Sequence, residues 1–316
     1  MKKYFLPALL AVSLLGCKAD LVVCTPDGGG TVTPPPATLT AFATQYGAIS
    51  QQFSLTPGSG QTVTTAKGNR FAFTPSNFVR SDNRPLSTSP IKMAVREIMG
   101  KGDMVLSAMP TVDTNGQLLE SAGEFQLLAT QDNVPLRIND TTRVTFSTVP
   151  PAMLNSAQGM QLFVGGGSGT ACFGWVPVPS STLSSNGQQG FAGSVPGTLL
   201  NSGEGWINCD RFATIQTATP LAVTVAGSNV TIDNTGVFIV FEDLNAVMKV
   251  CGVNGSSTFT AARVPVGARV KVLTLRTDNG RLYYGKQSLT IAQNQTLTLT
   301  PTEANEADIV ADIRGL

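Results

Sequence analysis

Short segments in which apolar and polar residues alternate recur through most of the chain. Ile91, Met93 and Val95, for example, alternate with Lys92, Ala94 and Arg96. Successive side chains of a β-strand point to opposite faces of its sheet, so this pattern predicts strands with one buried face. Turn pairs such as Asn115-Gly116 and Asn279-Gly280 favour tight connections between the strands. We therefore predict an all-β protein of antiparallel sandwiches.

The composition agrees with this fold class and excludes one class of partner. The 316 residues include 32 glycines and 19 prolines, and charged residues make up 13% of the chain. These values are typical of a turn-rich β protein rather than a helical one. The formal net charge is +1 and no basic block stands out. A nucleic-acid partner is therefore not expected.

Two sandwich domains are predicted, with the division at a pair of prolines. Pro150 and Pro151 follow Val149, and consecutive prolines cannot continue a central strand. The first domain is predicted over residues 41–149 and the second over residues 150–316. Thr300-Pro301-Thr302-Glu303 has the pattern of a capping box, which predicts a short C-terminal helix over residues 301–315.

The first forty residues have the pattern of a secretory leader followed by a spacer. Lys2 and Lys3 precede an apolar stretch over residues 4–15, which is too short to span a bilayer as a permanent helix. The run ends in Leu14-Leu15-Gly16-Cys17, which resembles the bacterial lipobox. This resemblance implies cleavage after residue 16 and a lipid on Cys17.

The spacer and its flanking residues suggest where the lipid holds the chain. Residues 17–40 contain a run of three glycines and a run of three prolines, which form no packed core, so a flexible tether is predicted. Lys18 stands where an aspartate would resemble an inner-membrane retention signal. An outer-membrane location follows by resemblance, with the periplasmic or cell-surface face left open.

Two parts of the chain resemble a family of Gram-negative surface lipoproteins of unassigned function. The first comprises Gly68-Asn69-Arg70-Phe71-Ala72-Phe73, Asn77-Phe78, Arg96-Glu97-Ile98, Asp103-Met104, Thr111, Asn115-Gly116, Leu118-Leu119-Glu120-Ser121 and Gly123. The second is Trp206-Ile207-Asn208-Cys209-Asp210-Arg211-Phe212. The first part is also distantly similar to the β-sandwich domain shared by zonula occludens proteins, netrin receptors and ankyrins. In those eukaryotic proteins the domain serves contact between proteins, and some members cut themselves at a His-Phe-Ser site.

The chain has no histidine. The self-cleavage of the eukaryotic relatives is therefore not carried over. Ser-His and Cys-His nucleophile pairs and most zinc geometries are excluded as well. We predict no catalytic residue, no cofactor and no metal.

Two alternatives that use carboxylates stay open. Glu97, Glu120 and Glu124 would be the acids of a histidine-free glycan hydrolase, although salt bridges with Arg96 or Arg137 and solvated faces are the favoured explanation. Asp103, Asp113 and Glu120 would be the ligands of an irregular calcium site, although a β-turn explains the sequence around Asp113.

Five cysteines are present, and three of them lie in the predicted second domain. An exported protein forms disulfides. Cys172 with Cys209 is the preferred pair, because each lies near a tryptophan, Trp175 or Trp206. Three buried free thiols are the alternative, because sequence does not determine connectivity.

These observations predict a lipid-anchored envelope protein whose non-catalytic β-sandwich surface binds another envelope protein. Binding of a carbohydrate is the first alternative, with Trp175 and Trp206 as the candidate ligand-binding residues. Burial of both tryptophans in the core is the competing interpretation. The histidine-free hydrolase is the second alternative.

Overall fold

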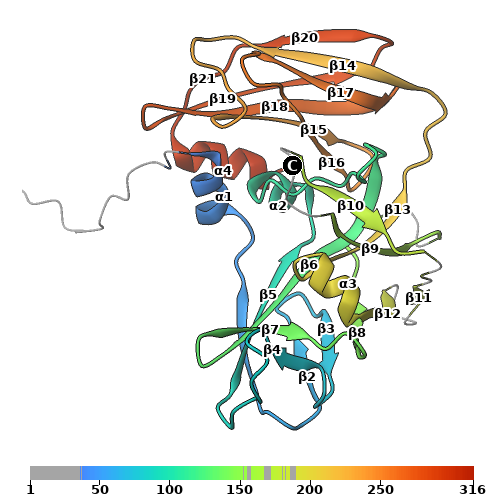
Figure 1. Cartoon of the computed structure of the whole chain (residues 1–316). Coiled ribbons are helices and arrows are strands. Elements are labelled where there is room, and N and C mark those ends of the chain that lie inside the picture. Colours follow the sequence, from blue (N-terminus) through green and yellow to red (C-terminus); the bar gives the residue numbers. More distant parts are fainter. Residues whose placement is uncertain are drawn as a thin grey trace, which may run out of the picture. The chain divides into compact units, whose positions relative to one another are not determined.

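The computed structural model describes residues 36, 38–151, 153–154, 158–166, 172–179, 181, 183–185 and 190–316. Cys17, the predicted leader and almost all of the predicted tether lie outside the described residues. The remainder, Pro35–Leu316, forms one compact unit. It consists mainly of antiparallel sheets with four short helices among the described residues, so the predicted all-β class is confirmed (Figure 1).

The first pair of sheets encloses a core rich in phenylalanine. The larger sheet has the strand order β1 (Gln51–Leu55), β5 (Ile91–Ile98), β6 (Leu119–Gln131), β13 (Trp206–Phe212), β9 (Gln161–Gly166) and β10 (Gly174–Pro177). In addition, β7 (Val134–Ile138) pairs with β6, and β4 (Phe78–Arg80) pairs with β7. The smaller sheet has the order β11 (Ser184–Ser185), β12 (Phe191–Pro196), β8 (Arg143–Thr148), β3 (Arg70–Phe73) and β2 (Gln61–Thr64). Phe71 from one sheet and Phe125 from the other pack edge to face within this core.

The second pair of sheets encloses a core of aliphatic residues. Its smaller sheet has the order β17 (Thr258–Pro265), β14 (Ala218–Val225) and β20 (Gln295–Leu299). Its larger sheet has the order β16 (Val247–Val250), β15 (Thr235–Phe241), β18 (Arg269–Asp278), β19 (Arg281–Thr290) and β21 (Thr302–Glu303). The β14–β20 pairing is parallel, whereas the other named pairings in both pairs of sheets are antiparallel. Val223 and Ile239 are fully buried between these two sheets.

The sheets do not divide at the predicted boundary between residues 149 and 150. β12 pairs with β8 from Phe191↔Thr148 onward, and β13 pairs with β6. Strands after the two prolines therefore belong to both sheets of the first pair, which extends to Phe212. The prolines end β8, as their missing N–H requires, but they do not prevent later strands from returning to the same sheets.

A third cluster of buried side chains joins three helices to both pairs of sheets. The helices are α1 (Leu39–Tyr46), α2 (Lys101–Leu106) and α4 (Glu306–Arg314), which lie together in Figure 1, and the fourth helix is α3 (Gly197–Ser202). Phe42, Met104 and Ile313 from the three helices pack in one cluster with Trp206 of β13 and Leu273 of β18. This cluster therefore packs the three helices against strands of both pairs of sheets.

Helical boundaries differ from those predicted at both ends of the body. α1 starts at Leu39, within the last residues of the predicted tether, and the Thr38 side chain accepts a hydrogen bond from the Ala41 amide. α4 starts at Glu306 rather than residue 301, because Thr302–Glu303 forms β21 beside β19. Asn305 caps α4 by accepting from the Asp308 amide. The predicted C-terminal helix is thus confirmed, with a later start.

Gly205 occupies a position that only glycine fits. Its φ is +79°, and a Cβ built on it would lie 2.3 Å from the carbonyl oxygen of Leu127. Gly205→Ala is expected to lower the free energy of unfolding by about 3 kcal/mol, through left-handed strain and overpacking together. Gly255→Ala is the matched control: its φ is +78°, but nothing lies within 4 Å of an added Cβ. It should cost only about 1 kcal/mol. Urea unfolding measures both, and equal losses would contradict the steric part of this explanation.

Candidate functional site

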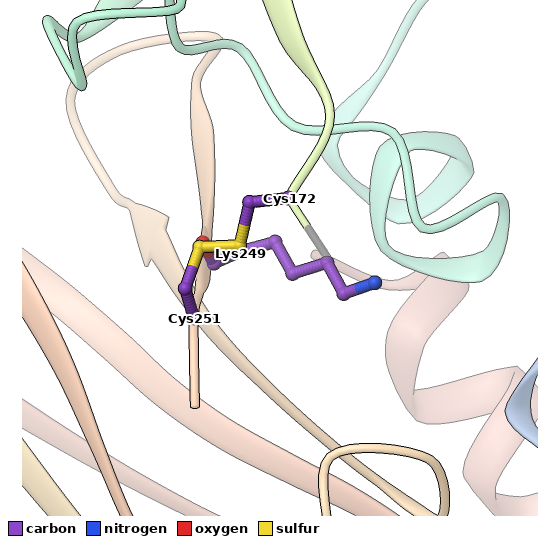
Figure 2. The surroundings of a disulfide bond; sticks show 3 residues. All are labelled: Cys172, Lys249 and Cys251. Atoms are coloured by element: carbon purple, nitrogen blue, oxygen red, sulfur yellow. A yellow bond between two sulfur atoms is a disulfide. The ribbon is translucent and has the colours of Figure 1, made fainter. Parts of the chain in front are cut away.

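Cys172 and Cys251 form a disulfide with a Cα–Cα distance of 6.1 Å (Figure 2). They are 79 residues apart in sequence and tie the segment before β10 to the residue after β16. The bridge therefore links the first pair of sheets covalently to the second. The predicted partner of Cys172 was Cys209, and that pairing is wrong.

Strand alternation explains why Cys209 is not the partner. Trp206 and Cys209 are three residues apart on β13, so their side chains lie on opposite faces of the sheet. Trp206 packs in the cluster with Trp175, whereas Cys209 is buried in the core of the first pair of sheets. Among the described residues Cys209 is a free cysteine, and burial raises the pKa of its thiol far above the ordinary value. Nearness of each cysteine to a tryptophan was thus a misleading signal.

A pocket of about 590 Å³ lies against the disulfide. Its walls come from the turn after Val112, from the start of β10, from β16 and from β17. The side chains that line the pocket are mainly small or apolar. The lining comprises Val112, Asp113, Thr114, Gly116, Gly166, Cys172, Phe173, Gly174, Val176, Met248, Lys249, Cys251, Thr260, Ala261 and Ala262.

The charge of the pocket is set by Lys249. Figure 2 shows its side chain extending past the disulfide, with the ammonium group directed away from the sulfur atoms. Its side chain makes no ion pair within the described part of the chain. Burial alone lowers its pKa, and no neighbouring carboxylate opposes this. The pocket therefore carries an uncompensated cation in a partly desolvated setting.

Asp113 lines the same pocket but does not balance this charge. Its Oδ1 accepts the backbone amides of Asn115 and Gln117, at 2.9 and 2.7 Å, and its Oδ2 accepts the Asn115 side-chain amide. The carboxylate is thus held by its own turn, and Asp113 is only 3% exposed. This turn was the one predicted at Asn115-Gly116.

The two tryptophans do not present a platform for a sugar. Trp175 is fully buried and Trp206 is 7% exposed, and their rings meet edge to face at 6.2 Å. The indole N–H of Trp175 donates to the Pro110 carbonyl at 2.8 Å. Both tryptophans are core residues. Because they are buried, the prediction that they bind a ligand is wrong. Trp175 lies on strand β10, and its side chain packs into the cluster that also contains Trp206.

The three candidate glutamates are not arranged around one cleft. Glu97 accepts hydrogen bonds from Gln51 and Asn69, each at 2.5 Å, and from the Thr65 hydroxyl. Glu120 is paired with Arg211. Glu124 shares the buried face of β6 and β13 with Asp210 and lies outside the pocket. Their burial and separate partners favour structural roles over glycoside cleavage.

Glu124 and Asp210 form a buried acidic pair that sequence analysis did not find. Neither oxygen of Glu124 receives a hydrogen bond from the described residues, and the side chain is fully buried. Burial raises the pKa of Glu124 well above its ordinary value, and the nearby Asp210 raises it further. Burial also raises the pKa of Asp210. The hydrogen bond that Asn208 donates to it, at 2.6 Å, lowers this pKa and partly offsets the rise. Burial therefore favours the protonated form of both carboxyls.

The three residues considered as calcium ligands interact with different partners and do not form one site. Asp103 is paired with Lys67 at 3.0 Å, Asp113 is held in its turn, and Glu120 is paired with Arg211. Within the described ranges, no three acidic or cysteine side chains converge on a point suited to a metal ion.

Comparisons with known proteins gave no match: no family model, no curated protein and no solved structure is similar to this chain. Of the helices in the described segments, none has the length and hydropathy needed to cross a membrane.

Proposed function

We propose that this chain is an exported, lipid-anchored protein of the bacterial outer membrane that binds another envelope protein without catalysing a reaction. The Cys172–Cys251 disulfide is the observation that carries this proposal. Disulfides form and persist in the periplasm and at cell surfaces but are rare in the reducing cytosol. A bridge between distant strands of a folded body fits an exported protein.

The N-terminal sequence supplies the anchor in this proposal. The lipobox-like Leu14-Leu15-Gly16-Cys17 supports a lipid on Cys17, and a glycine- and proline-rich sequence lies between that cysteine and α1. One acyl chain gives only marginal membrane binding, so stable attachment in this proposal needs a second attractive contribution besides a single chain on Cys17.

The pocket at the disulfide favours binding over turnover. Of its two ionisable side chains, Asp113 is occupied by its own turn and Lys249 faces no charged group among the described residues. Acid–base catalysis needs a positioned donor and acceptor within reach of one substrate atom. An isolated cation in an apolar pocket instead suits recognition of a negatively charged group. The buried tryptophans remove the reason for preferring a carbohydrate ligand.

Capture from native envelope tests the proposed function. The full chain, lipidated in its host, would be cross-linked in intact cells and isolated with its neighbours. A single protein partner recovered in stoichiometric amount is expected, and it should be lost when Cys17→Ala releases the chain from the membrane. Recovery of no stoichiometric partner, or turnover of an envelope glycan by the purified chain, would contradict the proposal.

A further inference from the structure

An unpaired stretch of sheet edge lies in the middle of β16, inside the pocket. The Val247 carbonyl accepts the Thr111 amide at 2.8 Å, and the Cys251 carbonyl accepts the Thr260 amide at 3.3 Å. Backbone groups alternate in direction along a strand, so the amide and carbonyl of Lys249 point to this same side. Within the described ranges, no group accepts from the Lys249 amide there. This edge of β16 is therefore hydrogen-bonded to Thr111 at one end and to Thr260 at the other, and among the described residues it is unpaired at Lys249.

The opposite edge of β16 forms its regular ladder, which is with β15. Phe241 donates to the Ala246 carbonyl, which places the even-numbered residues of β16 in the ladder with β15. Lys249 and Phe238 consequently face each other as a pair without mutual backbone hydrogen bonds. In the described part of the chain, only the Cys251 sulfur approaches the Lys249 carbonyl, at 4.0 Å, and this sulfur has no hydrogen to donate because it is in the disulfide. The amide and carbonyl of Lys249 are of the kind that an added strand uses in β-augmentation.

The side chains around this edge add an apolar wall and one cation. Val112, Phe173, Val176 and Met248 line the space beside the Lys249 side chain. Val176 is 39% exposed, although it lies on a strand that is otherwise well covered. The volume of about 590 Å³ lies in the usual range for pockets that hold a ligand. Because no carboxylate of the described chain reaches Lys249, a carboxylate brought by the ligand would complement it.

We propose that this pocket binds an extended peptide segment of the partner protein, which pairs with the open edge of β16 and places a carboxylate on Lys249. The inference rests on the proposed function and names the chemistry of the partner. The segment supplies apolar side chains to the wall formed by Phe173 and Met248. Its carboxylate belongs either to an acidic side chain or to a chain terminus.

Peptide arrays probe this chemistry directly. The full lipidated chain in detergent would be applied to random nine-residue peptides, each printed with a free carboxyl end and with an amidated end, and each also with Glu and Asp replaced by Gln and Asn. Binding by carboxylate-bearing peptides is expected to be at least tenfold stronger than binding by their neutral counterparts. Whether the preference follows the terminus or the side chain identifies which carboxylate is used.

Lys249→Met keeps the length of the side chain and removes its charge, so it should abolish this preference. Lys92→Met is the matched control, because Lys92 is exposed on β5 and does not line the pocket. It should leave binding unchanged. Equal binding of both peptide forms by the unmodified chain, no binding by any carboxylate-bearing peptide, or an unchanged preference in Lys249→Met would each overturn the inference. Binding of palmitate in place of peptides would also overturn it.

The envelope capture separates this inference from the proposed function. If Lys249→Met captures the same partner as the unmodified chain, the pocket is not the docking site, although the proposed function stands. If the unmodified chain captures no partner, the proposed function itself fails.

Discussion

Replacing both Cys172 and Cys251 with serine is expected to lower the free energy of unfolding by about 4 kcal/mol. The bridge closes a long loop, since the two cysteines are 79 residues apart, and it restricts the unfolded chain accordingly. The loss should appear in urea unfolding as a lower midpoint. The slope should be steeper, because an unbridged unfolded chain exposes more surface.

Reduction provides the control for this prediction. The unmodified protein in reductant should match the double variant, and the double variant should not respond to reductant. Cys209 should not contribute in either case, because it is a buried free thiol. A stability that is the same with and without reductant in the unmodified protein would show that the bridge does not constrain the fold.

Glu124→Gln is expected to stabilise the protein above neutral pH. The folded-state pKa of Glu124 is raised above its ordinary value of 4.5. The folded state therefore holds a proton that the unfolded state releases as the pH rises, so stability is present at low pH and declines above about pH 4.5. The decline is roughly 1 kcal/mol for each pH unit until the folded-state pKa is reached. The variant lacks this decline and should therefore be more stable than the unmodified protein at pH 8.

The control for the Glu124 prediction is Glu97→Gln, which alters a buried glutamate whose oxygens are hydrogen-bonded. Asn69 and Gln51 donate to Glu97, so the neutral side chain should weaken these contacts and lower stability at pH 8. Thermal unfolding from pH 4 to pH 9 measures both variants. Parallel pH profiles for Glu124→Gln and the unmodified protein would refute the burial of an unpaired acid. Asp210 retains its own pH dependence in either case.

The fold class was predictable because it depends on local patterns. Ile91, Met93 and Val95 are buried on β5 as their alternation predicted. Asn279-Gly280 forms the tight turn between β18 and β19, with φ values of 50° and 72°. Such features are encoded within a few residues, where side-chain period and turn preference act directly.

Pairings between distant segments were not predictable in the same way. The two prolines after Val149 end β8, but no local signal shows that β12 and β13 return to the first pair of sheets. The parallel pairing of β20 with β14 likewise has no signal within either segment. Such choices depend on how whole sheets bury their faces, which a single segment does not reveal.

The candidate site depended on the same long-range arrangement. The pocket combines residues near 112, 173, 249 and 261, and Cys251 had been the cysteine left without a partner. Lys249 gave no sequence signal, because its importance comes from the lack of a nearby acid in the folded chain. Trp175 and Trp206 attracted attention as large aromatics, but their neighbours in the fold make them core residues.

Mass spectrometry of the chain isolated from the envelope of its own host is the most direct test of the account. Under non-reducing conditions it should show a chain that begins at a lipid-bearing Cys17 and a cross-linked peptide joining Cys172 to Cys251. A chain that retains residues 1–16 without lipid, with Cys172 and Cys251 as free thiols, would contradict the proposed export, the proposed anchoring and the disulfide beside the pocket.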